Sequence, residues 1–272
     1  MFDWSPTPSF PMKVNGVALE YACHGPAPDQ APTIVMLHEG LGCVALWRDF
    51  PKKLSAQTGF GVLVFSRQGY GNSDPIQLPR GLDYQSQEPL EVLPPILEQA
   101  GIQRCILFGH SDGATMAAVY AGSVEDHRVR GLIVAAPHFF AEPKGLTEIE
   151  RTRDQFDTTD LAQRMGIYHR DPEGVFRGWA NVWLDPEFAD WNVAEVIDYI
   201  RVPILAIQGH DDQYGTMAHL DEITSRAYCP VDRVKLNCKH SPHLEAPEET
   251  LKAVAEFCAR LERIEAAQVK MA

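Results

Sequence analysis

The sequence predicts an α/β protein with a mostly parallel β-sheet, helices on both faces of that sheet, and an inserted helical cap. Short apolar runs alternate along the chain with longer helical segments, and such alternation produces a parallel sheet covered on both faces. The apolar runs are continuous, as in strands that are buried on both sides. The alternation pauses once, between residues 137 and 201, and this pause indicates the insertion.

The individual elements follow in order. An antiparallel hairpin is expected first, because Asn15-Gly16 lies between short extended runs and this pair favours a type I′ turn. Buried strands are expected at residues 33–37, 62–65, 105–108, 132–135, 204–207 and 234–236. Helices are expected at residues 46–58, 90–100, 112–121 and 248–264. The second of these helices contains Pro94-Pro95, which should kink it or delay its start.

The interrupted stretch contains no buried-strand run, and residues 148–164 have a helical, highly charged pattern. We therefore assign residues 1–137 and 201–272 to the sheet domain and residues 138–200 to a helical cap. Three of the five tryptophans lie in this cap. Its aromatic residues either pack the cap onto the sheet domain or wall an apolar pocket. On the second interpretation, Trp179 and Trp183 are candidate substrate-binding residues.

Composition limits the possible partners. The formal net charge is −13, which repels nucleic acid and anionic lipid surfaces, so we expect a small-molecule substrate, no nucleic acid and no membrane. The six cysteines include no Cys-x-x-Cys pair and are expected to be reduced thiols. The N-terminal residues lack a secretory pattern, and no apolar run approaches the roughly 18 residues of a membrane span. A cytoplasmic location is expected, and the oligomeric state is left open.

A Gly-x-Ser-x-Gly motif occupies residues 109–113, directly after a predicted strand and before a predicted helix. This context is typical of a nucleophile held on a sharp, strained turn, with Ser111 at the tip. The two glycines are needed because larger side chains at these positions would collide with neighbouring structure in such a turn. The N-terminus of the following helix favours negative charge where the substrate oxygen accumulates it. The motif therefore makes Ser111 the candidate nucleophile.

A nucleophilic serine needs a histidine base and a carboxylate that orients the histidine. In this architecture the acid follows a later strand and the histidine follows the last strand. The loop after residues 204–208 offers Asp211 and Asp212, and the loop after residues 234–236 offers His240 and His243. Each loop thus holds two candidates.

With these motifs the chain resembles the α/β-hydrolase superfamily over nearly its whole length. It resembles in particular the capped subset of meta-cleavage-product hydrolases and valacyclovir-hydrolase-like esterases. In that family a Gly-x-x-Asp pattern carries the acid and matches Gly209 and Asp212. A His-x-x-x-x-Glu-x-Pro pattern carries the base and begins at His240. The resemblance therefore implies Asp212 and His240 as the catalytic partners of Ser111.

The oxyanion that forms during the reaction needs two backbone N–H donors. One is expected from Asp112, and the other from the loop at residues 38–42. This loop resembles the family's His-Gly-x loop but has Glu39 in place of the usual glycine. Gly40 is the expected second donor and Leu41 the alternative. The resemblance places pocket walls at the start of the cap, so His138 and Phe139 are candidate substrate-binding residues, and Leu41 of the loop at residues 38–42 is a further candidate.

The resulting hypothesis is a serine hydrolase that cleaves a small, largely apolar ester or thioester through an acyl-enzyme, with no metal and no cofactor. Carbon–carbon hydrolysis of a ring-fission diketone is an alternative on the same fold. A non-catalytic ligand-binding module is an alternative of another class. A metal cluster could be drawn from the aspartates and histidines of the two loops, but a Ser–His–Asp triad explains their order without a metal.

Overall fold

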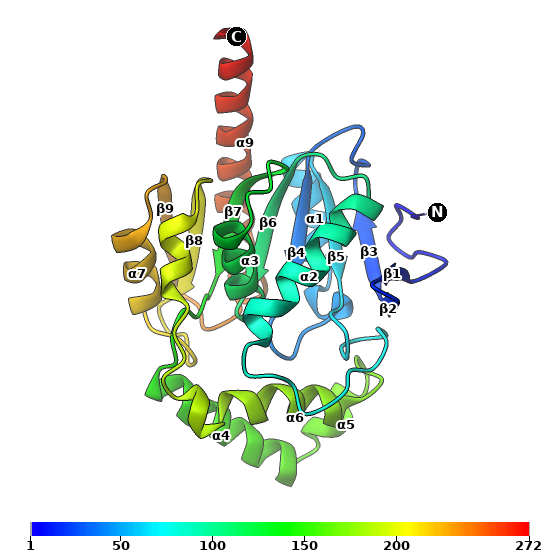
Figure 1. Ribbon diagram of the computed structural model, residues 1–272, viewed down its shortest axis with the longest axis vertical. Coiled ribbons are helices and arrows are strands. Elements are labelled where there is room, and N and C mark those ends of the chain that lie inside the picture. Colours follow the sequence, from blue (N-terminus) through cyan, green and yellow to red (C-terminus); the bar gives the residue numbers. More distant parts are fainter. Residues whose placement is uncertain (1, 272) are drawn as a thin grey trace.

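The computed structural model describes residues 2–271 and the side chains of residues 2–267. A seven-stranded sheet with the order β3-β5-β4-β6-β7-β8-β9 forms its centre (Figure 1). The strands are β3 (Tyr21–His24), β4 (Thr33–Leu37), β5 (Gly61–Phe65), β6 (Cys105–His110), β7 (Val129–Ala135), β8 (Ile204–Gly209) and β9 (Val231–Leu236). Only β3 pairs antiparallel, with β5, and all other pairs in this sheet are parallel. The predicted α/β class with a mostly parallel sheet is confirmed.

The predicted strands lie inside the observed ones, and the differences occur where a strand is partly exposed. β7 begins three residues before its apolar run, with Arg130 exposed. β9 lies at the edge of the sheet and has only one buried residue, Leu236. Its first residues are therefore not part of a continuous apolar run. The edge strand β3 was not predicted. β1 (Met12–Val14) and β2 (Val17–Leu19) form the predicted hairpin, with positive φ at Asn15 and Gly16.

Side chains of the central strands point alternately into two apolar cores. Val35 and Leu37 of β4 belong to one core, and Ile34 and Met36 belong to the other. The first core contains residues of α2 (Tyr84–Gln99), α3 (Asp112–Ser123) and α7 (Ala218–Arg226). The second contains residues of α1 (Phe50–Thr58) and α9 (Pro247–Met271). Burial on both faces explains why the strand sequences are continuously apolar.

Two helix predictions were wrong at their starts. Residues 46–58 do not form one helix, because Arg48 has φ of 53° between a 3-10 turn, η1 (Val44–Trp47), and α1. The helix predicted at residues 90–100 begins at Tyr84 and continues through three prolines. Its buried residues Leu93 and Ile96 pack in the first core. We attribute the continuation to this packing, which compensates for the backbone hydrogen bonds that the prolines remove.

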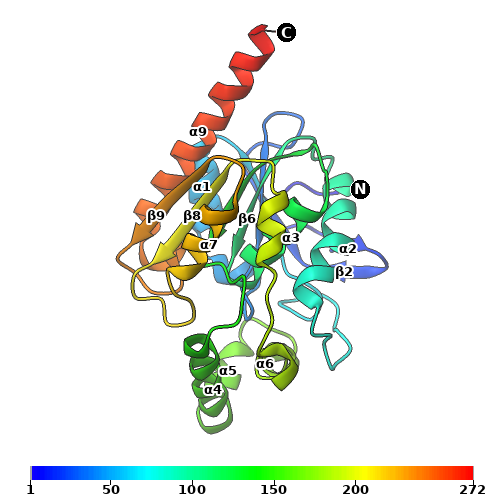
Figure 2. The ribbon, with the colours of Figure 1, turned by 60° about the vertical axis from the view of Figure 1, so that its left-hand side comes forward.

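The inserted segment forms helices below the carboxyl ends of the strands (Figures 1 and 2). α4 (Pro143–Thr158), α5 (Leu161–Met165) and α6 (Pro172–Trp183) pack against one another. The helical pattern at residues 148–164 therefore belongs to two helices, separated after α4 ends at Thr158. After η2 (Pro186–Phe188), η3 (Ala194–Tyr199) returns to pack on α3 and α7. None of the helices described across residues 2–271 is long and apolar enough to span a bilayer.

Candidate active site

Ser111 lies between β6 and α3 with φ of 53° and ψ of −119°, which is a strained conformation for a residue that has a side chain. Two close approaches explain the neighbouring glycines. A Cβ atom on Gly109 would lie 2.1 Å from the carbonyl oxygen of Gly113, and one on Gly113 would lie 2.2 Å from that of Leu37. The turn therefore requires both glycines.

His240 lies between the hydroxyl of Ser111 and the carboxylate of Asp212. Its Nε2 is 2.9 Å from Ser111 Oγ, and its Nδ1 is 2.8 Å from Asp212 Oδ2. Because an ionised carboxylate only accepts hydrogen bonds, Nδ1 carries the proton and Nε2 is free to accept one from Ser111. The three side chains thus form an unbroken hydrogen-bonded chain that can remove the proton of Ser111.

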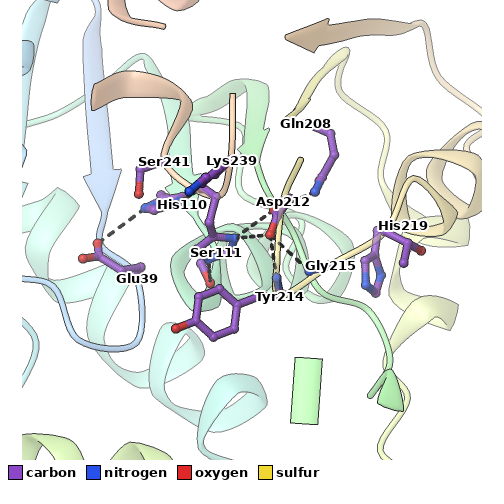
Figure 3. Close-up of polar contacts among 12 residues, drawn as sticks. Glu39, His110, Ser111, Gln208, Asp212, Tyr214, Gly215, His219, Lys239 and Ser241 are labelled. Carbon is purple, nitrogen blue, oxygen red and sulfur yellow. Dashed lines mark hydrogen bonds and ion pairs between the residues drawn. The ribbon is translucent and has the colours of Figure 1, made fainter. Parts of the chain in front are cut away.

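Asp212 is held by more than His240. It accepts hydrogen bonds from Gln208 Nε2 at 2.7 Å and from the amides of Tyr214 and Gly215 at 2.8 and 3.2 Å (Figure 3). Burial alone would raise the pKa of Asp212, but the hydrogen bond and charge of His240 outweigh it and hold that pKa well below its ordinary value. Asp212 is therefore ionised at neutral pH and can orient the imidazole.

The other candidate in each loop lies elsewhere. Asp211 is exposed, whereas Asp212 is only 1% exposed. His243 is the second residue of the short helix α8 (Pro242–Glu245). It packs against Trp47, with ring centroids 4.6 Å apart. The structure thus brings Asp212 and His240 to Ser111, while Asp211 and His243 lie outside the hydrogen-bonded chain.

The loop after β4 is held through the carbonyl group of Glu39. This oxygen accepts from His38 Nδ1 at 2.7 Å, from Arg67 Nη2 at 3.1 Å and from the amide of Gly42 at 3.1 Å. The N–H of Gly40 belongs to the same planar peptide group and points to the opposite side. Among the residues the structure describes, the amides of Gly40, Leu41 and Asp112 have no acceptor. These amides are therefore available to a substrate oxygen, and the orientation of the Gly40 amide is set by three donors.

Glu39, which replaces the usual glycine, is paired with His110, the residue before Ser111. Its Oε2 lies 3.5 Å from Nδ1 of His110, whose Nε2 lies 2.7 Å from the carbonyl oxygen of His240 (Figure 3). Burial alone would lower the pKa of His110, but Glu39 outweighs it and raises that pKa. Gly42 leaves space for the carboxylate, because a Cβ atom there would lie 2.3 Å from it. The acid is thus compensated by an adjacent imidazole.

His169 connects the inserted segment to the same loop. Its Nδ1 accepts from the amide of Gly71 at 2.9 Å, so Nε2 carries the proton and donates to the carbonyl oxygen of Leu41 at 3.0 Å. Burial lowers the pKa of His169, which favours the neutral form that this arrangement requires. Sequence analysis did not single out this histidine, because its partners are distant in the sequence.

A cavity of about 180 Å³ opens beside Ser111. Four of the five candidate substrate-binding residues line it: Leu41, His138, Trp179 and Trp183. Phe139 does not line this cavity and is 1% exposed within the apolar core. Lining residues that the sequence analysis missed are Glu142, Gly145, Ile149 and Tyr214. No local pattern distinguishes these four from other residues of a charged helix or loop.

His138 lies next to the hydrogen-bonded chain, with its ring centroid 5.7 Å from that of His240 and 5.5 Å from that of Trp183. Burial, together with the neighbouring histidines, holds the pKa of His138 well below its ordinary value. Its ring is therefore neutral at neutral pH. Within residues 2–267, the buried Nδ1 of this ring has no hydrogen-bond partner.

Fold and site together define a hydrolase of the α/β class. The family described as alpha/beta hydrolase fold matches residues 32–168, half of the chain, and the chain belongs to that family. It is 24% identical over 230 residues to a bifunctional esterase/perhydrolase of Acinetobacter calcoaceticus, covering 73% of this chain and 80% of that protein.

Solved structures show the same fold. An enol-lactonase from Burkholderia xenovorans superposes with a TM-score of 0.68 at 21% identity, covering 90% of this chain and 98% of that one. A carboxylesterase structure from Nitrososphaera gargenis superposes with a TM-score of 0.74 at 19% identity, covering 94% of this chain and 99% of that one. At these identities the likeness establishes the architecture, and the reaction has to be argued from the site.

Proposed function

We propose that the chain is a serine hydrolase that cleaves small, largely apolar carboxylic esters or thioesters through an acyl-enzyme. The observation that carries this proposal is the hydrogen-bonded chain from Ser111 through His240 to Asp212, which ends at a cavity walled by tryptophans. Nucleophile, base and orienting acid are the three groups that acyl transfer requires. The esterase named among the relatives is consistent with this reaction.

The proposed mechanism begins when His240 Nε2 takes the hydroxyl proton as Ser111 Oγ attacks the carbonyl carbon. The substrate oxygen then becomes an anion, which the amides of Gly40 and Asp112 stabilise. The carbon–oxygen or carbon–sulfur bond breaks, and His240 delivers its proton to the departing alcohol or thiol. Water, deprotonated by His240, then attacks the acyl group on Ser111. The bond between the acyl carbon and Ser111 Oγ breaks, His240 returns the proton to Oγ, and the carboxylic acid is released.

We further propose that residues 1–137 and 201–272 form the catalytic domain and residues 138–200 a cap that walls the substrate site. Ile149 of α4 and the two tryptophans of α6 supply apolar walls of the cavity that Ser111 also lines. His169 ties this cap to the loop that holds Gly40. Apolar walls with few polar groups are the usual setting for a small ligand, and the small cavity favours short acyl groups.

The test is hydrolysis of p-nitrophenyl esters of increasing acyl length by the wild-type protein and by Ser111→Ala. We expect activity on short acyl chains that Ser111→Ala abolishes, and labelling of Ser111 by a fluorophosphonate, located by mass spectrometry. Full activity in Ser111→Ala would overturn the proposal. A folded wild-type protein whose serine is not labelled and that hydrolyses no ester would instead identify a ligand-binding module.

A further inference from the structure

The cavity beside Ser111 carries negative charge. Glu39 and Glu142 both line it, and among its lining residues in the described part of the chain there is no lysine or arginine. Burial alone would raise the pKa of Glu142, but hydrogen bonds from His219 and Thr216 lower it to about 2. The pKa of Glu39 is likewise held well below its ordinary value, because His110 outweighs the effect of burial. Both carboxylates are therefore ionised at neutral pH.

The partners of Glu142 fix it in place. Its Oε2 accepts from the amide of Thr216 at 2.8 Å and lies 2.9 Å from Nε2 of His219, and its Oε1 accepts from the hydroxyl of Thr216 at 2.7 Å. The ammonium group of the nearby Lys144 donates to the carbonyl oxygen of Asp212 and does not line the cavity. Glu142 thus presents its charge from a position that three contacts define.

His138 supplies an independent indication of what the cavity binds. It is 6% exposed and lines the cavity, and within the described side chains its buried Nδ1 has no hydrogen-bond partner. A buried polar group without a partner costs free energy unless a ligand satisfies it. Because this ring is neutral, it can bind an uncharged polar atom but cannot neutralise a carboxylate.

Resting on the proposed ester hydrolysis, we propose that Glu39, Glu142 and His138 make the cavity select esters whose acyl chain is uncharged or carries an ammonium group, and reject those whose acyl chain carries a carboxylate. A substrate carboxylate would face the carboxylates of Glu39 and Glu142, while among the described residues no lysine or arginine lines the cavity and the imidazole paired with Glu39 lies outside its lining. The same field helps the acid product to leave, because the product becomes a carboxylate only after the acyl-enzyme is hydrolysed.

The test uses three methyl esters with the same chain of three methylenes, ending in a methyl, a carboxylate or an ammonium group. These are methyl pentanoate, monomethyl glutarate and methyl 4-aminobutyrate, and acid release is followed at pH 7.5. We expect kcat/KM for the glutarate to be at least about tenfold below that for the pentanoate, as one like charge at short range in a partly buried site produces. The aminobutyrate should be hydrolysed at least as well as the pentanoate.

Two variants identify the source of the discrimination. Glu142→Gln and Glu39→Gln should each raise the ratio of glutarate to pentanoate hydrolysis several-fold. Glu187→Gln, an exposed acid of η2 outside the cavity, is the matched control and should leave the ratio unchanged. Equal kcat/KM for the glutarate and the pentanoate would overturn the inference, and so would a ratio that neither cavity variant changes.

A binding measurement tests the charge selection independently of the proposed hydrolysis. Calorimetry with Ser111→Ala compares pentanamide with glutaramate, which differ by the same terminal charge but are measured without turnover. If no ester is hydrolysed but pentanamide binds at least about tenfold more tightly than glutaramate, the proposed function fails and the charge selection stands. If the pentanoate is hydrolysed and the two amides bind equally, the function stands and the charge selection fails.

Discussion

The carboxylate of Glu39 lies 3.5 Å from the imidazole of His110, and the same imidazole contacts the carbonyl oxygen of His240. One buried ring therefore joins the loop that carries Gly40 to the loop that carries the proposed base. An unpaired carboxylate beside a developing oxyanion would oppose catalysis, because like charges repel. Pairing with His110, whose pKa Glu39 raises against the effect of burial, makes an acid at this position tolerable.

We predict that His110→Phe will lower kcat/KM by roughly tenfold to a hundredfold, since misplacement of reacting groups has effects of this size. It should also lower the free energy of unfolding by about 1–3 kcal/mol, because Glu39 loses its partner. The double variant Glu39→Gly/His110→Phe should be less destabilised than His110→Phe alone. Urea unfolding and steady-state kinetics of the wild type, Glu39→Gly, His110→Phe and the double variant measure both effects, and strictly additive losses would contradict the coupling.

Asp212→Asn tests the orienting acid. The amide can no longer hold the imidazole as an ionised carboxylate does, so kcat should fall by roughly 10³–10⁴ while the fold is retained. Asp211→Asn is the matched control, because Asp211 is adjacent in sequence but exposed, and its activity should stay within about twofold of wild type. Similar losses in both variants would show that the wrong residue had been assigned as the acid.

Gly40→Ala tests the loop donor. The added Cβ atom would lie 2.3 Å from Nε1 of Trp179, so either the loop or the indole must move. We expect kcat/KM to fall at least roughly tenfold with little change in the thermal midpoint. Trp179→Ala introduced together with Gly40→Ala should recover part of the loss in kcat, because it removes the obstruction. If the double variant recovers no activity, the loss in Gly40→Ala arises from the backbone of Gly40 and not from the clash with Trp179.

Stability should decrease as the pH falls below about 6.5. Burial lowers the pKa of His38, His138, His169 and His243 in the folded protein, so the unfolded chain binds more protons between the folded pKa and the ordinary value of 6.5. Their contribution to the free energy of unfolding is therefore fully present above pH 6.5. It is lost as the pH falls below 6.5, at about 1.4 kcal/mol per pH unit for each proton. The raised pKa of His110 acts oppositely: its contribution is full below 6.5 and is lost at higher pH.

Urea unfolding from pH 7.5 to 5 measures this dependence. His243→Phe should flatten the slope, because the ring between Trp47 and Phe50 would no longer take up a proton on unfolding. His127→Phe, at an exposed position, is the control and should leave the slope unchanged. A wild-type stability that rises on acidification would contradict the prediction.

Several features could be predicted because they depend on local pattern. Buried parallel strands are continuously apolar, so the run at residues 33–37 coincides with β4. The turn around Ser111 needs small neighbours, and the glycine spacing records that need. By contrast, the start of α2 could not be predicted, because three prolines argue against a helix that its packing stabilises.

Some residues of the candidate site could likewise be predicted from local patterns, and others could not. Local spacing, together with the family resemblance, selected Ser111, Asp212 and His240, whose sequence separations do not reveal that their side chains touch. Contact arises only because β6, β8 and β9 end at one edge of a parallel sheet, where their loops converge. Residues with no local pattern of their own, such as Glu142 and His169, acquire a place in the site only through that convergence.

By itself, the sequence determined the fold class, most strands and the turn around Ser111, because each depends on burial or backbone geometry within a few residues. Tertiary structure alone decided which amide of the loop after β4 is held by its neighbours and that Glu39 is paired with His110. It also decided that two carboxylates, and no lysine or arginine, line the cavity among the described residues. These properties depend on distances between groups far apart in the chain, which only the packed sheet and its inserted helices define.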